Sequence, residues 1–357
     1  MTVDFIFDFL TDLLDGIIGS DYLLVVSMLI PCLAVFGFIT VYALIVIYAE
    51  LKVSSFIQDK VGPMGQGVGL HAGKWGLLQP VADALKLLLK EDIIPSSADK
   101  PLFILAPFMI FIGAFISFIA IPFGDSIIIA DLNIGLFYIL GVGSIAVLSL
   151  ILAGWASNNK WSLYGGMRSA AQIVSYEIPA GLSLIVVIML AGTLNMQDII
   201  TYQAGGMFNW ILFDNPFVPI TFVVYFISAI AETNRTPFDL PESESELVAG
   251  FATEYSGMRY AFFFLSEYAN MFVVSAVAAA GFLGGWHSPI PGFMDSSAWG
   301  VFWMISKTFF LIFVMIWLRW TLPRLRVDQL MNVCWKVFLP LALINIFGVA
   351  IWTVVFN

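Results

Sequence analysis

Carboxylates are concentrated in one stretch of the sequence, residues 232–267. Its acids are Glu232, Asp239, Glu242, Glu244, Glu246, Glu254 and Glu267. Glu242, Glu244 and Glu246 follow Pro241, and a short helix beginning there would place Glu242 and Glu246 on one face. Like charges this close repel each other, which raises some of their pKa values. Because carboxyl groups tuned in this way exchange protons near neutral pH, the stretch predicts proton transfer.

An acidic run of this kind is usually a solvated loop. Two features argue against that interpretation. The run is bracketed by Glu232 and Glu267, which lie in apolar segments. It is also interleaved with side chains that favour burial, namely Phe238, Leu240, Leu247, Val248, Phe251 and Tyr255. We therefore expect the acids to be paired or to share protons, with the flanking Arg235 and Arg259 as candidate cations.

Other ionisable residues fall within apolar segments or at their edges. These are Glu177, Glu232, Glu267 and Lys307. A charge at the bilayer centre costs about 2.5–3.5 kcal/mol, so each must face the protein interior or a wet cavity. They could simply pair at helix ends, but their number favours a hydrated, proton-exchanging interior. Glu50 is followed closely by Lys52, and we expect these two to form an interfacial pair.

Membrane helices must position these residues. The chain is 60% hydrophobic and 11% charged, whereas soluble domains are about 25% charged. We predict an all-α polytopic membrane protein with about eight transmembrane helices in a single transmembrane domain, residues 1–357. The expected spans are 22–49, 101–122, 134–156, 163–192, 217–236, 259–284, 299–320 and 334–356. The main connections on one side are 50–100, 237–258 and 321–333.

Charge distribution predicts the orientation. One set of connections contains Lys and Arg, whereas the opposite set has neither. The opposite set carries Asp4, Asp8, Asp12, Asp15, Asp21, Asp125, Asp131, Asp198, Asp214 and Asp295. These ten aspartates equal the excess of 25 acids over 15 bases. The positive-inside rule places the basic set in the cytoplasm and both termini outside, so the net charge of −10 does not indicate a basic ligand.

The connection 50–100 contains a further predicted helix. Leu78, Val81, Leu85 and Leu88 recur at helical spacing over 75–90, which is typical of an amphipathic helix at the membrane interface. The glycine-rich segment 62–74 has no strand before it and no βαβ context, so it does not indicate a nucleotide site.

Redox chemistry within the chain is not expected. Two cysteines, Cys32 and Cys334, cannot supply the four thiolates of an iron–sulfur cluster. The two histidines fall in predicted loops, which disfavours axial ligation of a haem, and no metal site is predicted.

The segment from Glu232-Thr-Asn-Arg-Thr-Pro-Phe-Asp-Leu-Pro-Glu through Glu254-Tyr-Ser-Gly-Met to Glu267-Tyr closely resembles the signature of the quinone-site membrane subunit of respiratory complex I, NADH:quinone oxidoreductase (the H-type subunit of bacteria, subunit 1 in mitochondria). Three further segments are similar to that family. They are Gly62-Pro63 with Leu78-Gln-Pro-Val-Ala-Asp83, Gly154-Trp-Ala-Ser-Asn-Asn-Lys160 with Arg168 to Glu177, and Pro323-Arg-Leu-Arg-Val-Asp-Gln-Leu-Met331. The resemblance covers nearly the whole chain in order.

This resemblance implies a bacterial inner-membrane subunit that forms the entry of a quinone cavity and relays redox energy to pump subunits. The quinone, ubiquinone or menaquinone, is the bound substrate, and FMN and iron–sulfur clusters belong to partner subunits. Expected partners are peripheral-arm subunits on the cytoplasmic side, small and antiporter-like membrane subunits, and lipid. The implied relay residues are Asp83, Glu177, Glu232, Asp239, Glu242, Glu244, Glu246, Glu254 and Glu267, with Arg235 as counter-ion. The implied cavity residues are Glu50, Lys52, Phe56, Gln58, Lys60 and Arg259.

The sequence departs from the family near the expected cavity entrance. Leu51 stands where the family usually has Arg, Lys60 replaces an Arg, and Met64 replaces an Asn. Loss of arginine is not conservative at a headgroup site, because only arginine presents a planar, permanently charged fork of donors.

Two alternatives fit parts of the pattern. A related subunit of an energy-converting hydrogenase-type complex would share the acids without a quinone, but the Leu-Gln-Pro and Asp-Gln-Leu-Met segments favour complex I. A stand-alone secondary transporter is disfavoured, because such folds typically contain internal repeats and none is evident here.

Overall fold

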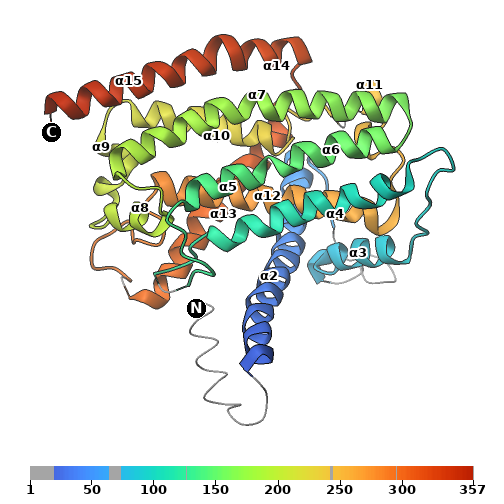
Figure 1. Ribbon diagram of the computed structural model, residues 1–357, viewed down its shortest axis with the longest axis horizontal. Coiled ribbons are helices and arrows are strands. Elements are labelled where there is room, and N and C mark those ends of the chain that lie inside the picture. The colour runs from blue at the N-terminus through green and yellow to red at the C-terminus, as the bar shows by residue number, and fades with distance from the viewer. Residues whose placement is uncertain (1–19, 64–73, 126, 242–243, 295, 357) are drawn as a thin grey trace.

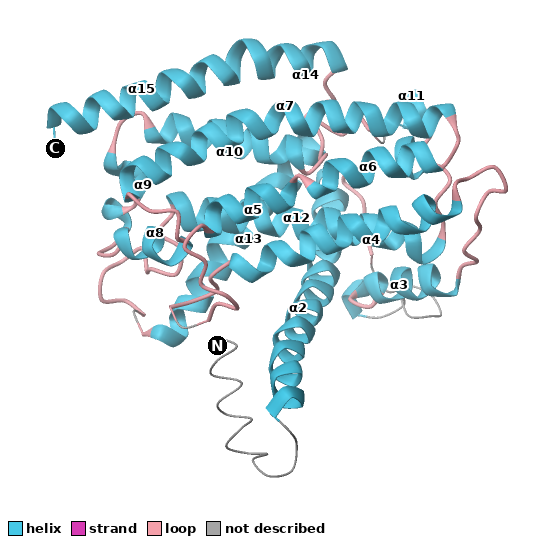
Figure 2. Ribbon diagram, in the orientation of Figure 1, coloured by secondary structure: helices cyan, strands magenta, loops and turns pink. Residues whose placement is uncertain are grey.

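The computed structural model describes residues 20–63, 74–125, 127–241, 244–294 and 296–356. In these ranges the chain is helical apart from turns, loops and one isolated bridge between Gly124 and Ile127 (Figure 2). The predicted all-α polytopic class is confirmed. Seven helical segments of the described chain are long and apolar enough to cross a membrane, and an eighth, α10, is shorter.

The long segments are formed by α2 (Ser20–Ile57), α4 (Lys100–Ser117), α5 (Gly135–Gly143) joined to α6 (Ile145–Ala156), α7 (Lys160–Ala191), α12 (Gly257–Phe282), α13 (Ser297–Thr321), and α14 (Val327–Val333) running through a π-helical turn (Cys334–Phe338) into α15 (Leu339–Phe356). α10 (Val218–Glu232) has 15 residues. That length spans roughly 22 Å, less than the roughly 30 Å hydrocarbon core.

Short helices fill the connections. They are α3 (Gln79–Leu89), α8 (Met196–Tyr202), α9 (Ile211–Asp214) and α11 (Glu244–Leu247). The predicted amphipathic segment corresponds to α3, whose first turn contains Pro80, a favourable position because the missing N–H needs no partner there. The last long helix begins at Val327 rather than within the predicted span 334–356. The Arg326 N–H donates to Gln329 Oε1 at 3.3 Å and so starts the helix earlier.

Small residues allow the close packing of the central helices. α4, α6 and α7 lie side by side, and α15 runs along α7 (Figure 1). A Cβ atom on Gly154 would lie 2.6 Å from Ser162 O, and one on Gly165 would lie 2.6 Å from Gly250 Cα. Close backbone approach through small residues is typical of membrane helices. At Gly165 it brings the loop after α11 directly against α7.

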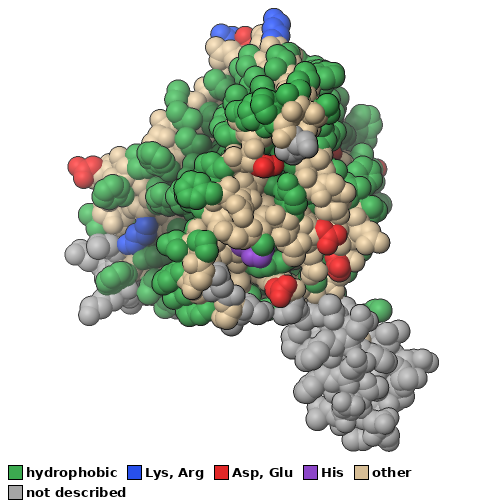
Figure 3. All heavy atoms as spheres, turned by 90° about the vertical axis from the view of Figure 1, so that its left-hand side faces the viewer, with side chains coloured by type: hydrophobic (Ala, Val, Ile, Leu, Met, Phe, Trp, Pro, Cys, Tyr) green, Lys and Arg blue, Asp and Glu red, His purple; other side chains and the backbone are tan. Residues whose placement is uncertain are grey.

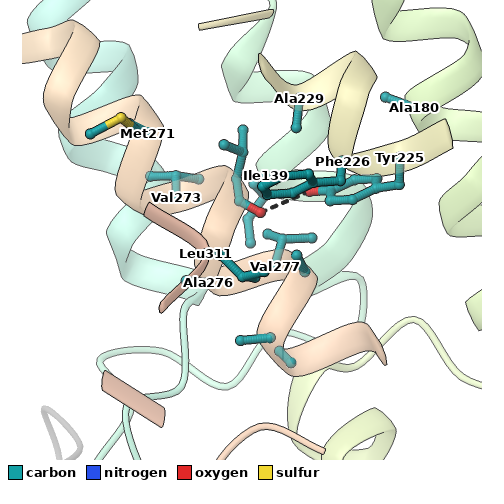
Figure 4. Packing of buried hydrophobic residues seen from close by; sticks show 14 of the residues in the cluster. Ile139, Ala180, Tyr225, Phe226, Ala229, Met271, Val273, Ala276, Val277 and Leu311 are labelled. Atoms are coloured by element: carbon teal, nitrogen blue, oxygen red, sulfur yellow. Dashed lines mark hydrogen bonds between the residues drawn. The ribbon is translucent and has the colours of Figure 1, made fainter. Parts of the chain in front are cut away.

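Aromatic and aliphatic side chains fill the interior between α10, α12 and their neighbours. Tyr225, Ile139, Val273 and Val277 meet there, and the Tyr225 hydroxyl donates to Val274 O at 3.1 Å (Figure 4). A second cluster lies around the loop after α11, where the rings of Phe103 and Tyr255 stack at 4.1 Å. These two cores fix α12 at the centre of the bundle.

The exterior is mainly apolar. On α15, the side chains of Ile344, Phe347, Ile351 and Val354 are exposed. The end of the bundle facing the viewer in Figure 3 is likewise dominated by hydrophobic side chains with scattered acidic ones. A surface of this kind suits lipid as the surrounding solvent.

Candidate functional site

Five buried or half-buried residues form an ion-pair network that we call the arginine cluster: Glu50, Arg235, Glu267, Tyr268 and Arg319. The Glu50 carboxylate accepts from the Tyr268 hydroxyl at 2.6 Å, from Arg235 Nη1 at 3.4 Å, and from Arg319. Arg235 Nη2 lies 3.9 Å from the Glu267 carboxylate, and its guanidinium lies 4.2 Å from the centre of the Tyr268 ring. Two carboxylates and two guanidinium groups therefore balance each other in the interior.

Three helices and one loop bring these residues together. Glu50 lies on α2, Tyr268 on α12 and Arg319 on α13, and α2 packs against both other helices. Arg235 lies in the loop after α10. Asn234 immediately before it has a φ of 52°, a left-handed conformation that asparagine tolerates better than most residues.

Gln172 on α7 fixes this loop. Its Nε2 donates to Ala231 O and Phe238 O, each at 2.8 Å, and also lies 3.1 Å from Asn234 Oδ1. The amide thus binds the chain before and after Arg235 and ends α10 at Glu232. Gln172 was not among the predicted site residues, because a single buried glutamine carries no distinctive pattern in the sequence.

Asp239 forms a separate pair beside the cluster. Its Oδ2 accepts from Arg324 Nη2 at 2.7 Å, and its Oδ1 has no hydrogen-bond partner among the described residues. Burial raises the pKa of Asp239, and this effect outweighs the lowering by Arg324, Arg319 and Arg235. Asp239 is therefore easier to protonate than an exposed aspartate.

Glu177 and Glu232 approach each other around the junction of α5 and α6. The Ser144 hydroxyl donates to Glu177 Oε1 at 2.5 Å. A Cβ atom on the neighbouring Gly143 would lie 3.5 Å from Glu232 Oε1. The junction of α5 and α6 is therefore next to both Glu177 and Glu232.

Glu232 also lines two neighbouring cavities. The first cavity has a volume of about 40 Å³, with Tyr225 and Asn270 among its lining residues. The second cavity has a volume of about 20 Å³ and is lined by Glu232, Glu267 and Asn270, among others. Glu232 therefore borders two cavities, the second of which also borders Glu267 of the arginine cluster.

The remaining predicted acids pair with residues outside the predicted set. Glu246 pairs with Arg168 at 2.6 Å, and Glu254 accepts from Asn159 Nδ2 at 2.6 Å. Arg259 Nε lies 3.1 Å from Asp92, so its predicted pairing with the glutamate run is wrong for the described acids. Arg259 lies at the start of α12, and Asp92 in the connection before α4 lies next to it there.

Asp83 lies apart from these acids. It accepts from Gln79 Nε2 at 3.2 Å and is 4.0 Å from Lys86, all on α3. Glu242 lies outside the described residues, and of Glu244 only the backbone, at the start of α11, is described.

Burial of the apolar side chains in the acidic loop follows the prediction with one exception. Phe238, Leu240, Leu247, Phe251 and Tyr255 are buried, whereas Val248 is 59% exposed. Val248 has a φ of 67°, so its backbone turns there and directs the side chain outward.

The expected pair of Glu50 with Lys52 is wrong. Lys52 Nζ donates to Pro63 O at 2.9 Å, while Glu50 faces the arginine cluster. Residues two apart on a helix point in nearly opposite directions, so these two cannot face the same partner. Beyond them, Phe56 is 86% exposed, and Gln58 and Lys60 are exposed as well.

Arg319 is the main ionic residue that was not predicted from the sequence. It lies inside the predicted span 299–320, and an arginine in a span must find a carboxylate. That signal was present, but Glu50 is distant in sequence and could not be identified as the partner. The Tyr268 hydroxyl had no comparable signal.

Lys307 uses backbone partners. Its Nζ donates to Leu283 O at 2.6 Å, Gly285 O at 2.9 Å and His287 O at 2.7 Å, and lies 4.3 Å from the Trp210 ring centre. The ammonium thus caps the end of α12, where helix carbonyls favour a cation.

The two cysteines are free thiols in different surroundings. Cys32 is exposed and Cys334 is buried, and the Cys334 thiol donates to Ser175 O at 3.0 Å. No group of three His, Cys, Asp or Glu side chains in the described ranges is arranged to hold a metal ion.

Comparisons with known proteins give a consistent result. A sequence model described as NADH dehydrogenase matches residues 30–350. A Chlorobaculum tepidum protein, named as the H subunit of NADH-quinone oxidoreductase, is 55% identical over 328 residues, covering 89% of this chain and 90% of the relative. A Geobacter metallireducens H subunit of the same enzyme is 47% identical, covering 92% and 96%. The Anoxybacillus flavithermus H subunit is 50% identical, covering 89% and 90%.

Proposed function

The chain belongs to the NADH dehydrogenase family as an H-type subunit of NADH-quinone oxidoreductase, and from this premise we propose that it forms the quinone entry cavity and relays redox energy through its buried acids. It is a multi-pass membrane subunit of an oxidoreductase complex whose substrate is a quinone. The proposal concerns which residues receive the quinone and how the energy leaves the site.

One observation carries the relay. The second cavity borders Glu267 of the arginine cluster and Glu232, Glu232 also borders the first cavity, and Glu177 is bonded to Ser144 beside the Gly143 that approaches Glu232. Glu267 contacts Arg235 and lines the second cavity, so it belongs to both the cluster and the path. A series of buried acids that share space in this way can pass a proton or a charge displacement.

The cluster can respond to quinone reduction because its charges are balanced and its carboxylates are buried. Reducing a quinone to a quinol takes two electrons and two protons. A proton drawn from a nearby acid would leave an extra negative charge, which the neighbouring guanidinium groups would attract. Arg235 contacts both Glu50 and Glu267. A shift of Arg235 toward one carboxylate weakens its hold on the other, so a change near the cavity reaches Glu267.

Asp239 and Arg324 would act between the quinone and the cluster. Their pair lies at the half-exposed edge of the site, with the Arg324 side chain 40% exposed and that of Asp239 10% exposed. The raised pKa of Asp239 suits a group that binds and releases protons during turnover.

The cavity entrance is proposed at the end of α2. Phe56, Gln58 and Lys60 are exposed there, next to the Lys52 contact with Pro63. The aromatic ring and amide would contact the headgroup and the first isoprenoid units. Lys60 would supply a point charge where the family usually has an arginine fork. Arg259 would support this region through Asp92.

The assembly and location follow from the same premise. We propose peripheral-arm subunits carrying FMN and iron–sulfur clusters on the side of α3 and the acidic loop, with antiporter-like subunits receiving the relayed energy. Asp83, Glu246 and Glu254 would serve the relay from that side, and Glu242 and Glu244 would complete it. The membrane is proposed to be the bacterial inner membrane, with both termini periplasmic.

A coupled assay tests the proposal. The complex is purified through a tag on this chain, and NADH oxidation is measured with a quinone and with an artificial acceptor. Glu232→Gln should lower quinone-linked proton pumping several-fold while leaving the artificial-acceptor rate unchanged. Asp328→Asn, an exposed substitution at the start of α14, is the control. Normal pumping by Glu232→Gln, or recovery of the chain without flavin and iron–sulfur subunits, would contradict the proposal.

A further inference from the structure

We propose that Asn270 is a positioning residue for the relay, and that its amide holds the water through which a proton passes between Glu267 and Glu232. This inference rests on the proposed relay and names the step by which its two central acids communicate. It assigns a role to a neutral residue that none of the charge arguments selects.

Asn270 lies where the two cavities meet. It follows Glu267 by three residues on α12, so both side chains lie on the same face of the helix. Only Glu232 and Asn270 among the polar residues of the described chain line both cavities; the other shared lining residues are Ala146 and Ile173. Glu267, Glu232 and Asn270 all line the second cavity, so water between the two acids would lie beside the Asn270 amide.

The amide has unused hydrogen-bonding capacity. An asparagine side chain offers two N–H donors and a carbonyl acceptor, and that of Asn270 makes no hydrogen bond to another described residue. Leaving such a group unpaired in apolar surroundings carries a substantial free-energy cost. Water in the adjoining cavities is the partner that removes this cost, because their volumes of about 40 and 20 Å³ exceed the roughly 15 Å³ that one water molecule needs.

The surrounding walls localise that water. Most of the first cavity is lined by aliphatic side chains such as Ile139, Val273 and Val277, shown in Figure 4. The other hydroxyls of this cavity already donate to backbone carbonyls, that of Tyr225 to Val274 O and that of Ser117 to Gly113 O. A water molecule there finds its open polar contacts at Asn270 and Glu232, which places it beside the acid.

A neutral amide suits this position better than another acid. It can donate to one water or carboxylate while accepting from another, and it adds no charge that would fix the proton on either side. By contrast, both N–H groups of Gln172 Nε2 are taken up by backbone oxygens, so this amide only holds a loop. The step itself moves one proton and no electrons: the carboxyl of one glutamate loses the proton, and the carboxylate of the other gains it.

The charged groups around the path link this step to the quinone side. Glu267 lies 3.9 Å from Arg235, which also contacts Glu50. Beyond Glu232 lies Glu177, held by Ser144. A charge change in the arginine cluster therefore favours proton release or uptake at Glu267, and the water at Asn270 carries the result to Glu232.

The test uses the intact complex with Asn270→Leu, which keeps the number and branching of the heavy atoms and removes all hydrogen-bonding groups. Proton pumping per NADH and quinone-linked turnover are expected to fall at least about five-fold, with the artificial-acceptor rate unchanged. Asn270→Ser, which keeps a donor and an acceptor and leaves room for water, should retain more than half of the pumping. Asn345→Leu removes a buried amide from α15, outside both cavities, and should pump normally.

The outcomes separate this inference from the proposed function. Full pumping by Asn270→Leu overturns it, and so does an equal loss in Asn270→Ser and Asn270→Leu, because packing alone would explain that result. Failure of both variants to assemble also assigns Asn270 to packing. An increased solvent isotope effect on pumping in Asn270→Leu, absent in Asn345→Leu, would support the water step. If Glu232→Gln pumps normally, the relay itself is wrong.

Discussion

Replacing Glu50 by glutamine should destabilise the protein more than any other single loss of an acid among the described residues. The substitution keeps the shape of the side chain but removes the charge that faces Arg235 and Arg319. The side chain of Glu50 is 9% exposed and that of Arg235 is 5% exposed, so water cannot replace the lost partner. The variant leaves a net positive charge in the interior.

The magnitude follows from these contacts. Breaking a buried ion pair by removing one partner typically costs about 3–5 kcal/mol. Glutamine retains one oxygen acceptor for Tyr268, so we expect about 3 kcal/mol, which corresponds to a decrease in melting temperature on the order of 5 °C. Glu267→Gln should cost less, about 1 kcal/mol, because its carboxylate lies 3.9 Å from Arg235 and its side chain is 15% exposed.

The assay compares thermal unfolding and quinone-linked turnover of purified complexes. Asp328→Asn is the matched control, because it breaks an ion pair with Arg326 whose side chains are 80% and 69% exposed. That change should stay within about 0.5 kcal/mol. If Glu50→Gln melts at the same temperature as Asp328→Asn, the buried charges of the arginine cluster do not stabilise the fold.

Three further predictions concern other parts of the molecule. Gly165→Ala should destabilise by about 1–3 kcal/mol, because its Cβ would lie 2.6 Å from Gly250 Cα, whereas Gly181→Ala on the same helix meets nothing within 4 Å and should be neutral in a melting assay. Lys307→Met should lower the melting temperature by removing three charged hydrogen bonds, and exposed Lys336→Met should not. The pKa of Asp239 is raised in the folded state, so ionising Asp239 destabilises the fold. The free energy of unfolding should therefore increase as the pH falls through that pKa. Asp239→Asn should abolish this increase when melting is followed from about pH 8 to about pH 4.

Sequence patterns predicted the elements of the fold well because each spanning helix carries its own hydropathy signal. They also identified Glu232 and Glu267 as acids that face the interior or a cavity, and Arg235 as a candidate cation for the acids. They did not predict the partners, since pairing depends on how helices far apart in sequence pack together. Glu50 and Arg319 meet only because α2 contacts α13. Likewise, the closeness of Lys52 to Glu50 in sequence predicted the wrong partner, because helix geometry directs the Lys52 side chain away from Glu50.

Neutral residues were the least predictable part of the site. Gln172, Asn270 and Ser144 are ordinary polar residues in the sequence, yet they hold the loop, join the cavities and fix Glu177. Their importance comes from burial, which turns a modest hydrogen-bonding group into a costly one to leave unpaired.

The lysine at the centre of α13 has a consequence for how the chain enters the bilayer. If α13 partitioned alone, its ammonium would cost about 2.5–3.5 kcal/mol at the bilayer centre. The three carbonyls that accept from Lys307 all belong to residues 283–287, which are synthesised before α13. The growing chain therefore presents its own acceptors in advance. Insertion of α12 and α13 as a hairpin, rather than one helix after the other, is the order that keeps this charge satisfied throughout biogenesis.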